Sequence, residues 1–159
     1  MSEIADADAA AAAERLEDLL HDIADGLQLD ATVSVELADG TLTGRLDGED
    51  LGSFIGRRGQ TINAVQHLAQ RIVLRGADGW IRVVIDADDY RERRAETLRA
   101  DAEDAAEEAI RTGRPVELNP MPSVERRLIH EHLRDRDDVE TSSEGEEPDR
   151  YLVVFPVDD

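Results

Sequence analysis

A turn rich in glycine and arginine occurs at Ile55-Gly56-Arg57-Arg58-Gly59-Gln60-Thr61-Ile62. Its two glycines stand three positions apart, so the ends of the turn carry no side chain and a second backbone can approach closely. Amide groups at the start of the helix that follows, with the positive end of its dipole, can receive an anion. Arg57 and Arg58 add two outward cations, and Gln60 and Thr61 can add polar contacts. These properties favour a polynucleotide phosphate as the ligand.

Two other interpretations of this turn compete with phosphate binding. An isolated Gly-x-x-Gly is more often an ordinary turn between helices with solvated side chains, and only its context favours binding. The motif also lacks the Gly-Lys-Ser/Thr ending of a nucleotide-triphosphate loop and the glycine spacing of a dinucleotide fingerprint. Nucleotide hydrolysis is therefore not predicted.

Apolar periodicity predicts the elements on both sides of the turn, in the order α-β-β-α-α-β. The expected elements are helices near residues 16–27, 51–55 and 61–73, a hairpin over 32–46 that turns at Asp39-Gly40, and a strand over 80–86. Residues 1–13 are rich in Ala and Asp and are expected to fray. The sequence therefore assigns residues 1–11 to a flexible acidic N-terminus and residues 12–88 to a first unit.

A second unit is assigned to residues 89–159, including a long connecting helix. That helix is expected over residues 90–112, because Gly113 and Pro115 follow its last apolar position. The other expected elements are a short strand at 116–118, a helix from an N-cap at Ser123 to about residue 136, an acidic loop at 143–148 and a last strand at 151–157. The predicted fold class of the whole chain is α+β.

Composition limits the classes of protein that the chain can represent. It holds 159 residues, no cysteine, 38 acidic residues and 18 basic ones, all of which are Arg, for a net charge of −20. Residues 51–99 nevertheless hold 6 acidic residues and 9 arginines, a cationic island between two acidic flanks. The absence of cysteine indicates a reducing cytoplasm, and neither a signal peptide nor a membrane-spanning segment is expected.

A second candidate site lies on the helix predicted from Ser123. Arg126 and His130 are four positions apart and share one helix face, where a guanidinium and an imidazole can both meet a phosphate. A surface helix with a partly packed histidine is the competing interpretation. No catalytic set, metal site or cofactor site is predicted, because the neighbouring His130 and His132 point to different faces and no nucleophile motif occurs.

The turn at residues 55–62, between two amphipathic helices and before a strand, resembles the GXXG loop of a KH domain. The preceding hairpin and helix resemble the prokaryotic, type II arrangement. Residues 119–130, with residues 139–150, resemble the domain named for its Arg-x-x-x-His motif. The two together resemble the bacterial Jag, or SpoIIIJ-associated, family over nearly the whole chain.

This resemblance implies a clamp for single-stranded RNA, or single-stranded DNA, formed by Gly56, Arg57, Arg58 and Gly59, with a second contact from Arg126 and His130. It also implies a cytoplasmic, non-enzymatic, post-transcriptional regulator linked to cell elongation or division. A small single-KH protein is the implied partner. The alternative hypothesis is a protein-interaction adaptor, which the two acidic flanks favour, and an enzyme such as a nuclease ranks third.

Overall fold

A computed structural model gives the structure of the protein and describes residues 5–157. The chain divides into two compact units, Met1–Arg91 and Glu92–Asp159, three residues beyond the boundary expected from the sequence. Each unit has its own apolar core.

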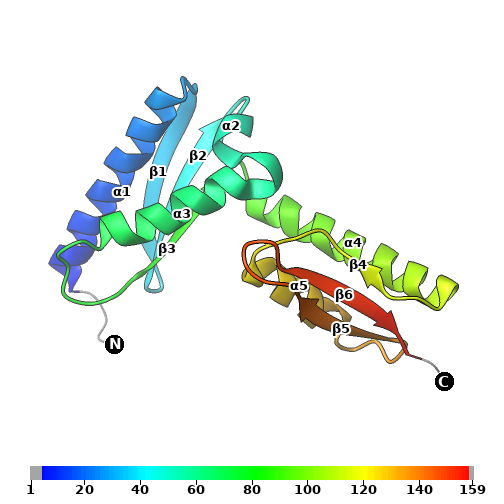
Figure 1. The fold of residues 1–159 in the computed structure, drawn as a ribbon. Helices are drawn as coiled ribbons and strands as arrows, with labels where there is room; N and C mark the ends of the chain where they lie inside the picture. Colours follow the sequence, from blue (N-terminus) through cyan, green and yellow to red (C-terminus); the bar gives the residue numbers. More distant parts are fainter. Residues whose placement is uncertain (1–4, 158–159) are drawn as a thin grey trace. The chain divides into compact units, whose positions relative to one another are not determined.

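The first unit has the predicted α-β-β-α-α-β order (Figure 1). Its elements are α1 (Asp6–Gly26), β1 (Ala31–Ala38), β2 (Thr41–Gly48), α2 (Gly52–Ile55), the 3₁₀ turn η1 (Arg57–Gly59), α3 (Gln60–Val73) and β3 (Arg82–Ala87). The hairpin turns at Asp39 and Gly40, where both residues have positive φ angles of 48° and 69°. Two successive positive φ angles match the right-handed twist of the strands, which explains why an Asp-Gly pair occupies this turn.

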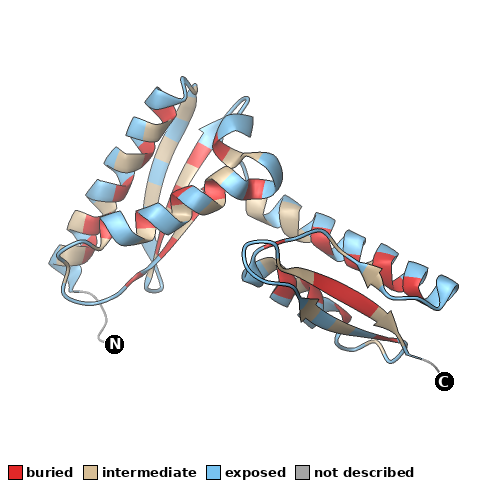
Figure 2. Ribbon diagram, in the orientation of Figure 1, coloured by how far each residue is buried: buried red, intermediate tan, exposed pale blue. Residues whose placement is uncertain are grey.

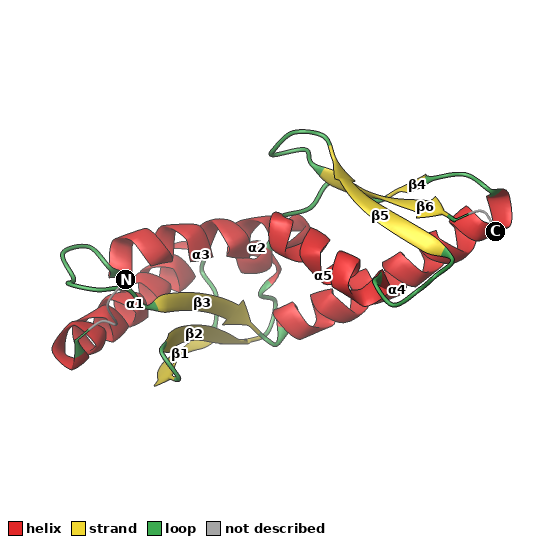
Figure 3. Cartoon of the chain, turned by 90° about the horizontal axis from the view of Figure 1, so that it is seen from below, coloured by secondary structure: helices red, strands yellow, loops and turns green. Residues whose placement is uncertain are grey.

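The sheet of the first unit has the order β1-β2-β3, with β1 and β2 antiparallel and β2 and β3 parallel. Helices form one layer and strands the other (Figure 3). Leu42, Gly44 and Leu46 are buried on alternate positions of β2, as expected for a strand covered on one face. A Cβ atom at Gly44 would lie only 2.6 Å from the Cδ1 of Leu20. The glycine therefore lets α1 pack directly on the backbone of β2.

The N-terminal prediction was wrong within the described residues, because α1 begins at Asp6 rather than near residue 16. Ala9 and Ala12 are buried, at 3% and 0% exposure. The backbone N–H of Asp78 also donates to Asp8. Tertiary contacts thus order a segment whose Ala/Asp composition indicated fraying. Residues 1–4 of the expected flexible N-terminus lie outside the described residues.

The second unit packs two helices against a second small sheet. Its elements are α4 (Tyr90–Thr112, which begins within the first unit), β4 (Val116–Glu117), α5 (Ser123–Leu133), β5 (Val139–Glu144) and β6 (Tyr151–Pro156). The sheet is antiparallel with the order β4-β6-β5. Figure 2 shows the buried residues along the faces that the helices and the sheet turn to each other. Predicted and observed structure therefore agree on the α+β class.

Three expectations for the second unit need correction. The predicted loop at 143–148 begins too early, because Ser143 and Glu144 belong to β5, a strand that the sequence did not indicate. Ser123 is the first residue of α5 rather than its N-cap, which is Pro122. The helix also ends at Leu133, three residues before the expected end. The sequence did not indicate β5 because most of its side chains are polar. Val139 is the only buried apolar residue among its six.

Candidate nucleic acid interface

The Gly-Arg-Arg-Gly loop has a backbone that only glycine accommodates at its first position. Gly56 has φ 73° and ψ 175°, a region essentially restricted to glycine. Gly59 has φ 75° and ψ 16°, the left-handed conformation, and ends the loop where α3 begins. Between them, Arg58 adopts φ 53° and ψ 29°. A non-glycine residue in this conformation stores about 1–3 kcal/mol of strain, which is characteristic of functional sites.

Both glycines are also required by close packing. A Cβ atom at Gly56 would lie 2.8 Å from the backbone N of Thr61, on the first turn of α3. A Cβ atom at Gly59 would lie 2.6 Å from the hydroxyl oxygen of Tyr90, at the start of α4. The loop is thus packed closely against the start of α3 and against Tyr90.

The cationic side chains of the loop are free to meet a ligand. Arg57 and Arg58 are exposed and neither forms an ion pair within residues 5–157. The first turn of α3 contains no acidic residue, and no side chain caps its N-terminus. The positive end of this 14-residue helix therefore remains available to an anion. Gln60 is exposed and Thr61 is half-buried at this same helix start.

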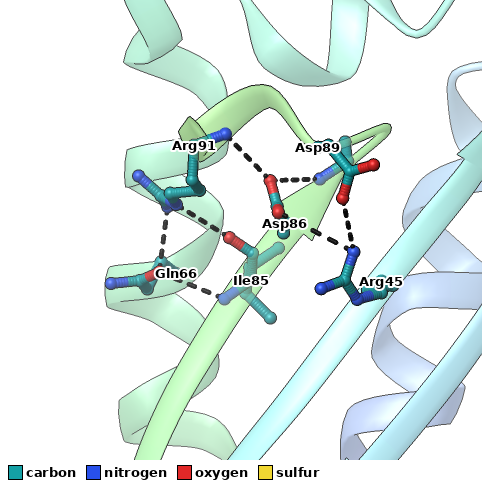
Figure 4. A network of polar contacts seen from close by, with 7 residues as sticks. Arg45, Gln66, Ile85, Asp86, Asp89 and Arg91 are labelled. Carbon is teal, nitrogen blue, oxygen red and sulfur yellow. Dashed lines mark hydrogen bonds and ion pairs between the residues drawn. The ribbon is translucent and has the colours of Figure 1, made fainter. Parts of the chain in front are cut away.

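A network around Arg91 fixes α3 against β3 (Figure 4). The guanidinium of Arg91 donates to the backbone oxygen of Ile85 at 3.0 Å, to Oε1 of Gln66 at 2.9 Å and to Oδ1 of Asn63 at 2.7 Å. Asn63 therefore has a structural role in this network. This network positions the helix whose N-terminus faces the loop.

The carboxylate of Asp86 is buried and belongs to the same network. Asp86 is 8% exposed and accepts hydrogen bonds from the backbone N–H groups of Ala87 and Arg91. Arg45 approaches Asp86 at 4.0 Å and Asp89 at 2.9 Å. The hydrogen bond to Asp89 and the charge of Asp86 raise the pKa of Arg45.

Two glutamines of α3 occupy the outer edge of β3. Gln70 donates to the backbone oxygen of Ile81 at 2.8 Å and accepts from the N–H of Val83 at 2.9 Å. Gln66 accepts from the N–H of Ile85 at 3.1 Å. These side chains satisfy edge groups that would otherwise be open to pairing with another strand. They also bind the second half of α3 to β3.

The Arg-x-x-x-His pair of the second unit lies against β5. Arg126 donates to the hydroxyl of Ser143, and Nδ1 of His130 contacts the hydroxyl of Thr141. Four helical residues advance about 6 Å and two strand residues about 6.6 Å. The contacts of Arg126 with Ser143 and of His130 with Thr141 can therefore form side by side between α5 and β5. The Nδ1 atom of His130 is held by Thr141. Because His130 is exposed, its other ring nitrogen, Nε2, is available to a ligand.

Arg126 does not occupy the open position that the sequence predicted. Its side chain is 8% exposed. Its guanidinium donates to the backbone oxygen of Met121 at 3.2 Å, to Ser143 and to the carboxylate of Glu147. The pair thus shares one helix face, as expected, but only His130 reaches the surface.

Sequence reasoning missed three residues around this pair: Thr141, Ser143 and Glu147. The spacing of Thr141 and Ser143 was the available signal, because i and i+2 on a strand match i and i+4 on a helix. His130 and His132 do point to different faces, since His132 contacts Glu103 of α4 at 2.8 Å. Within residues 5–157, no group of three metal-ligating side chains is placed to hold a metal ion.

Comparisons with known proteins agree with this architecture. Residues 13–85 match the KH domain described as KhpA/KhpB, and residues 96–156 match the domain named for its Arg-x-x-x-His motif. The chain is therefore a protein with a KH domain followed by an Arg-x-x-x-His domain. It belongs to the Jag family, which confirms the resemblance seen in the sequence.

Several curated relatives align over most of the chain. The protein named RNA-binding protein KhpB from Lactiplantibacillus plantarum is 43% identical over 143 residues, which cover 90% of this chain and 44% of the relative. The proteins of the same name from Clostridium symbiosum and Bacillus subtilis are 38% and 35% identical, covering 86% and 85% of this chain. These alignments span 63% and 66% of the two relatives.

Proposed function

We propose that this protein binds single-stranded RNA, with the GXXG loop of the KH domain as the principal clamp. The observation that carries the proposal is the loop itself, in which two glycines with positive φ angles hold Arg57 and Arg58 beside an uncapped helix N-terminus. Single-stranded nucleic acid presents a flexible phosphate backbone that such a loop can clamp. The name RNA-binding protein, carried by the relatives, supports RNA as the ligand.

Because the net charge of the chain is −20, RNA binding depends on the local positive charge of the loop. Bulk repulsion opposes binding of a polyanion, and only contacts within about a Debye length of the loop, ~10 Å at 0.1 M salt, offset it. A second, weaker contact from His130 in the Arg-x-x-x-His domain would raise the overall affinity, because both domains are carried by one chain.

Charge reversal in the loop tests the proposal. Fluorescence anisotropy with a labelled pool of single-stranded RNA is expected to show binding by the wild type and a loss of at least tenfold in Arg57→Asp/Arg58→Asp. Arg111→Asp/Arg114→Asp is the matched control, because it changes the net charge equally at two exposed positions of the second unit. Equal losses in the two variants would show that total charge, and not the loop, controls binding.

We also propose that the protein acts by binding rather than by catalysis. The sequence contains no nucleophile motif that would support hydrolysis. Incubation of labelled RNA with the protein and Mg²⁺ is expected to leave the RNA intact. Protein-dependent cleavage that a loop variant abolishes would overturn this proposal.

Membership in the Jag family supports a proposed regulatory role in cell elongation or division, with a small single-KH protein as partner. No helix within residues 5–157 has the length and apolar character needed to cross a membrane. Loss of the gene is expected to alter cell length or width, and the loop variant is expected not to restore it. Restoration by the loop variant would separate this role from RNA binding.

The adaptor hypothesis rests on a different surface. An acidic recess at the base of the β1–β2 hairpin has a volume of about 440 Å³ and is lined in part by Asp30, Asp47, Glu49 and Asp50. Its charge suits a basic protein segment and opposes RNA. A pull-down in which a specific partner resists nuclease and survives Arg57→Asp/Arg58→Asp would favour this function.

A further inference from the structure

The Arg-x-x-x-His domain contains a buried cation whose charged partner is exposed. The Arg126 side chain is 8% exposed, whereas that of Glu147 is 57% exposed. A buried guanidinium needs an anion, because an unpaired charge away from water is costly. Within residues 5–157, Glu147 provides the one ion pair of Arg126. The anion that balances this cation is therefore presented from the solvent side.

The remaining donors of Arg126 are fixed by the domain. One goes to the backbone oxygen of Met121 and a second to the hydroxyl of Ser143. These two contacts do not involve Glu147. Glu147 itself lies in the exposed connection between β5 and β6, where neighbouring residues are also exposed. The anion position can thus exchange without rearrangement of α5.

Further side chains near this position can contribute to the binding of an anion from solution. Arg150 donates from Nε to the same Ser143 hydroxyl at 3.1 Å, so a second guanidinium lies beside that of Arg126. His130 lies one helical turn further along α5, on the same face as Arg126. Carboxylate and phosphate present similar oxygen geometry to a guanidinium, so one can replace the other.

We propose that the Glu147 carboxylate occupies the position of an RNA phosphate in the Arg-x-x-x-His domain and that bound RNA displaces it. The proposal rests on the proposed function, since it assigns the phosphate subsite of that same RNA. The proposal explains why Arg126 is buried in the free protein, although this arginine belongs to the motif for which the domain is named. The affinity of the domain is then set by competition with its own carboxylate.

Removal of this internal competitor is expected to strengthen RNA binding. Glu147→Gln keeps an oxygen for Arg126 but removes the charge, and a charge-assisted hydrogen bond is about twice as strong as a neutral one. Anisotropy with a labelled single-stranded RNA octamer should show affinity about fivefold above the wild type. Glu146→Gln is the matched control, because it makes the same charge change at the adjacent exposed position. It is expected to improve affinity by less than twofold.

The other outcomes separate the proposal from the function on which it rests. Equal affinities of Glu147→Gln and Glu146→Gln, or weaker binding by Glu147→Gln, would overturn the displacement and leave RNA binding intact. Failure of the wild type and both variants to bind would overturn the proposed function and the subsite together. Adding Arg126→Gln to Glu147→Gln should abolish the gain, and circular dichroism would verify that this double variant folds.

Discussion

Neutralising the loop arginines should change how RNA affinity depends on salt. Each phosphate neutralised on a single strand contributes about 0.7 to the slope of log affinity against log salt, through counterion release. Arg57 and Arg58 are exposed, and two contacts therefore contribute a slope of about 1.4. Over the fourfold range from about 50 to 200 mM salt, this slope corresponds to about a sevenfold change in affinity.

The assay is fluorescence anisotropy with one single-stranded RNA at several salt concentrations. Arg57→Gln/Arg58→Gln is expected to bind more weakly than the wild type and to show a slope shallower by about 1.4. Arg111→Gln/Arg114→Gln, with the same change in net charge, is expected to keep the wild-type slope. An unchanged slope in the loop variant would refute direct phosphate contact by these side chains.

Three further predictions concern stability. Gly56→Ala should destabilise the first unit by about 1–3 kcal/mol in urea unfolding, because φ 73° with ψ 175° excludes a side chain; an unchanged midpoint would contradict the loop geometry. Arg58→Gly should stabilise that unit by up to about 1 kcal/mol while weakening RNA binding, since relief of left-handed strain exceeds the entropic cost of glycine. Finally, the hydrogen bond from Arg136 holds the pKa of Asp138 below its ordinary value of about 3.9. This pair stabilises the fold above about pH 4 and is lost as pH falls further, so Asp138→Asn should show a shallower acid-induced loss of stability than the wild type.

The sequence predicted the elements whose signals are local. The Asp39-Gly40 turn identified the hairpin because two consecutive positive φ angles suit few other pairs. The spacing of Gly56 and Gly59 identified the loop, because both positions have positive φ angles that favour glycine. The long helix Tyr90–Thr112 was predicted to the residue, because Gly113 and Pro115 mark its end.

The missed features depend on partners that are distant in the sequence. β5 is a polar segment that becomes a strand only by pairing with β6, as in the register of Ser143 with Leu152. Arg126 is held by Ser143 and Glu147, which lie 17 and 21 positions later in the sequence. The helical start at Asp6 likewise depends on burial of Ala9 and Ala12. Each of these features depends on residues outside its own segment, so the apolar periodicity of that segment does not indicate it.

Mapping RNA onto the protein by NMR would show which residues of the KH domain contact the ligand. Two-dimensional ¹H–¹⁵N spectra of the full chain would be recorded while a single-stranded RNA octamer is added. If the loop clamps RNA, the largest amide shifts in the KH domain will fall on residues 56–61, at the loop and the start of α3. Largest shifts at the acidic recess around Asp47 and Asp50, or no shift in the loop at saturation, would contradict it.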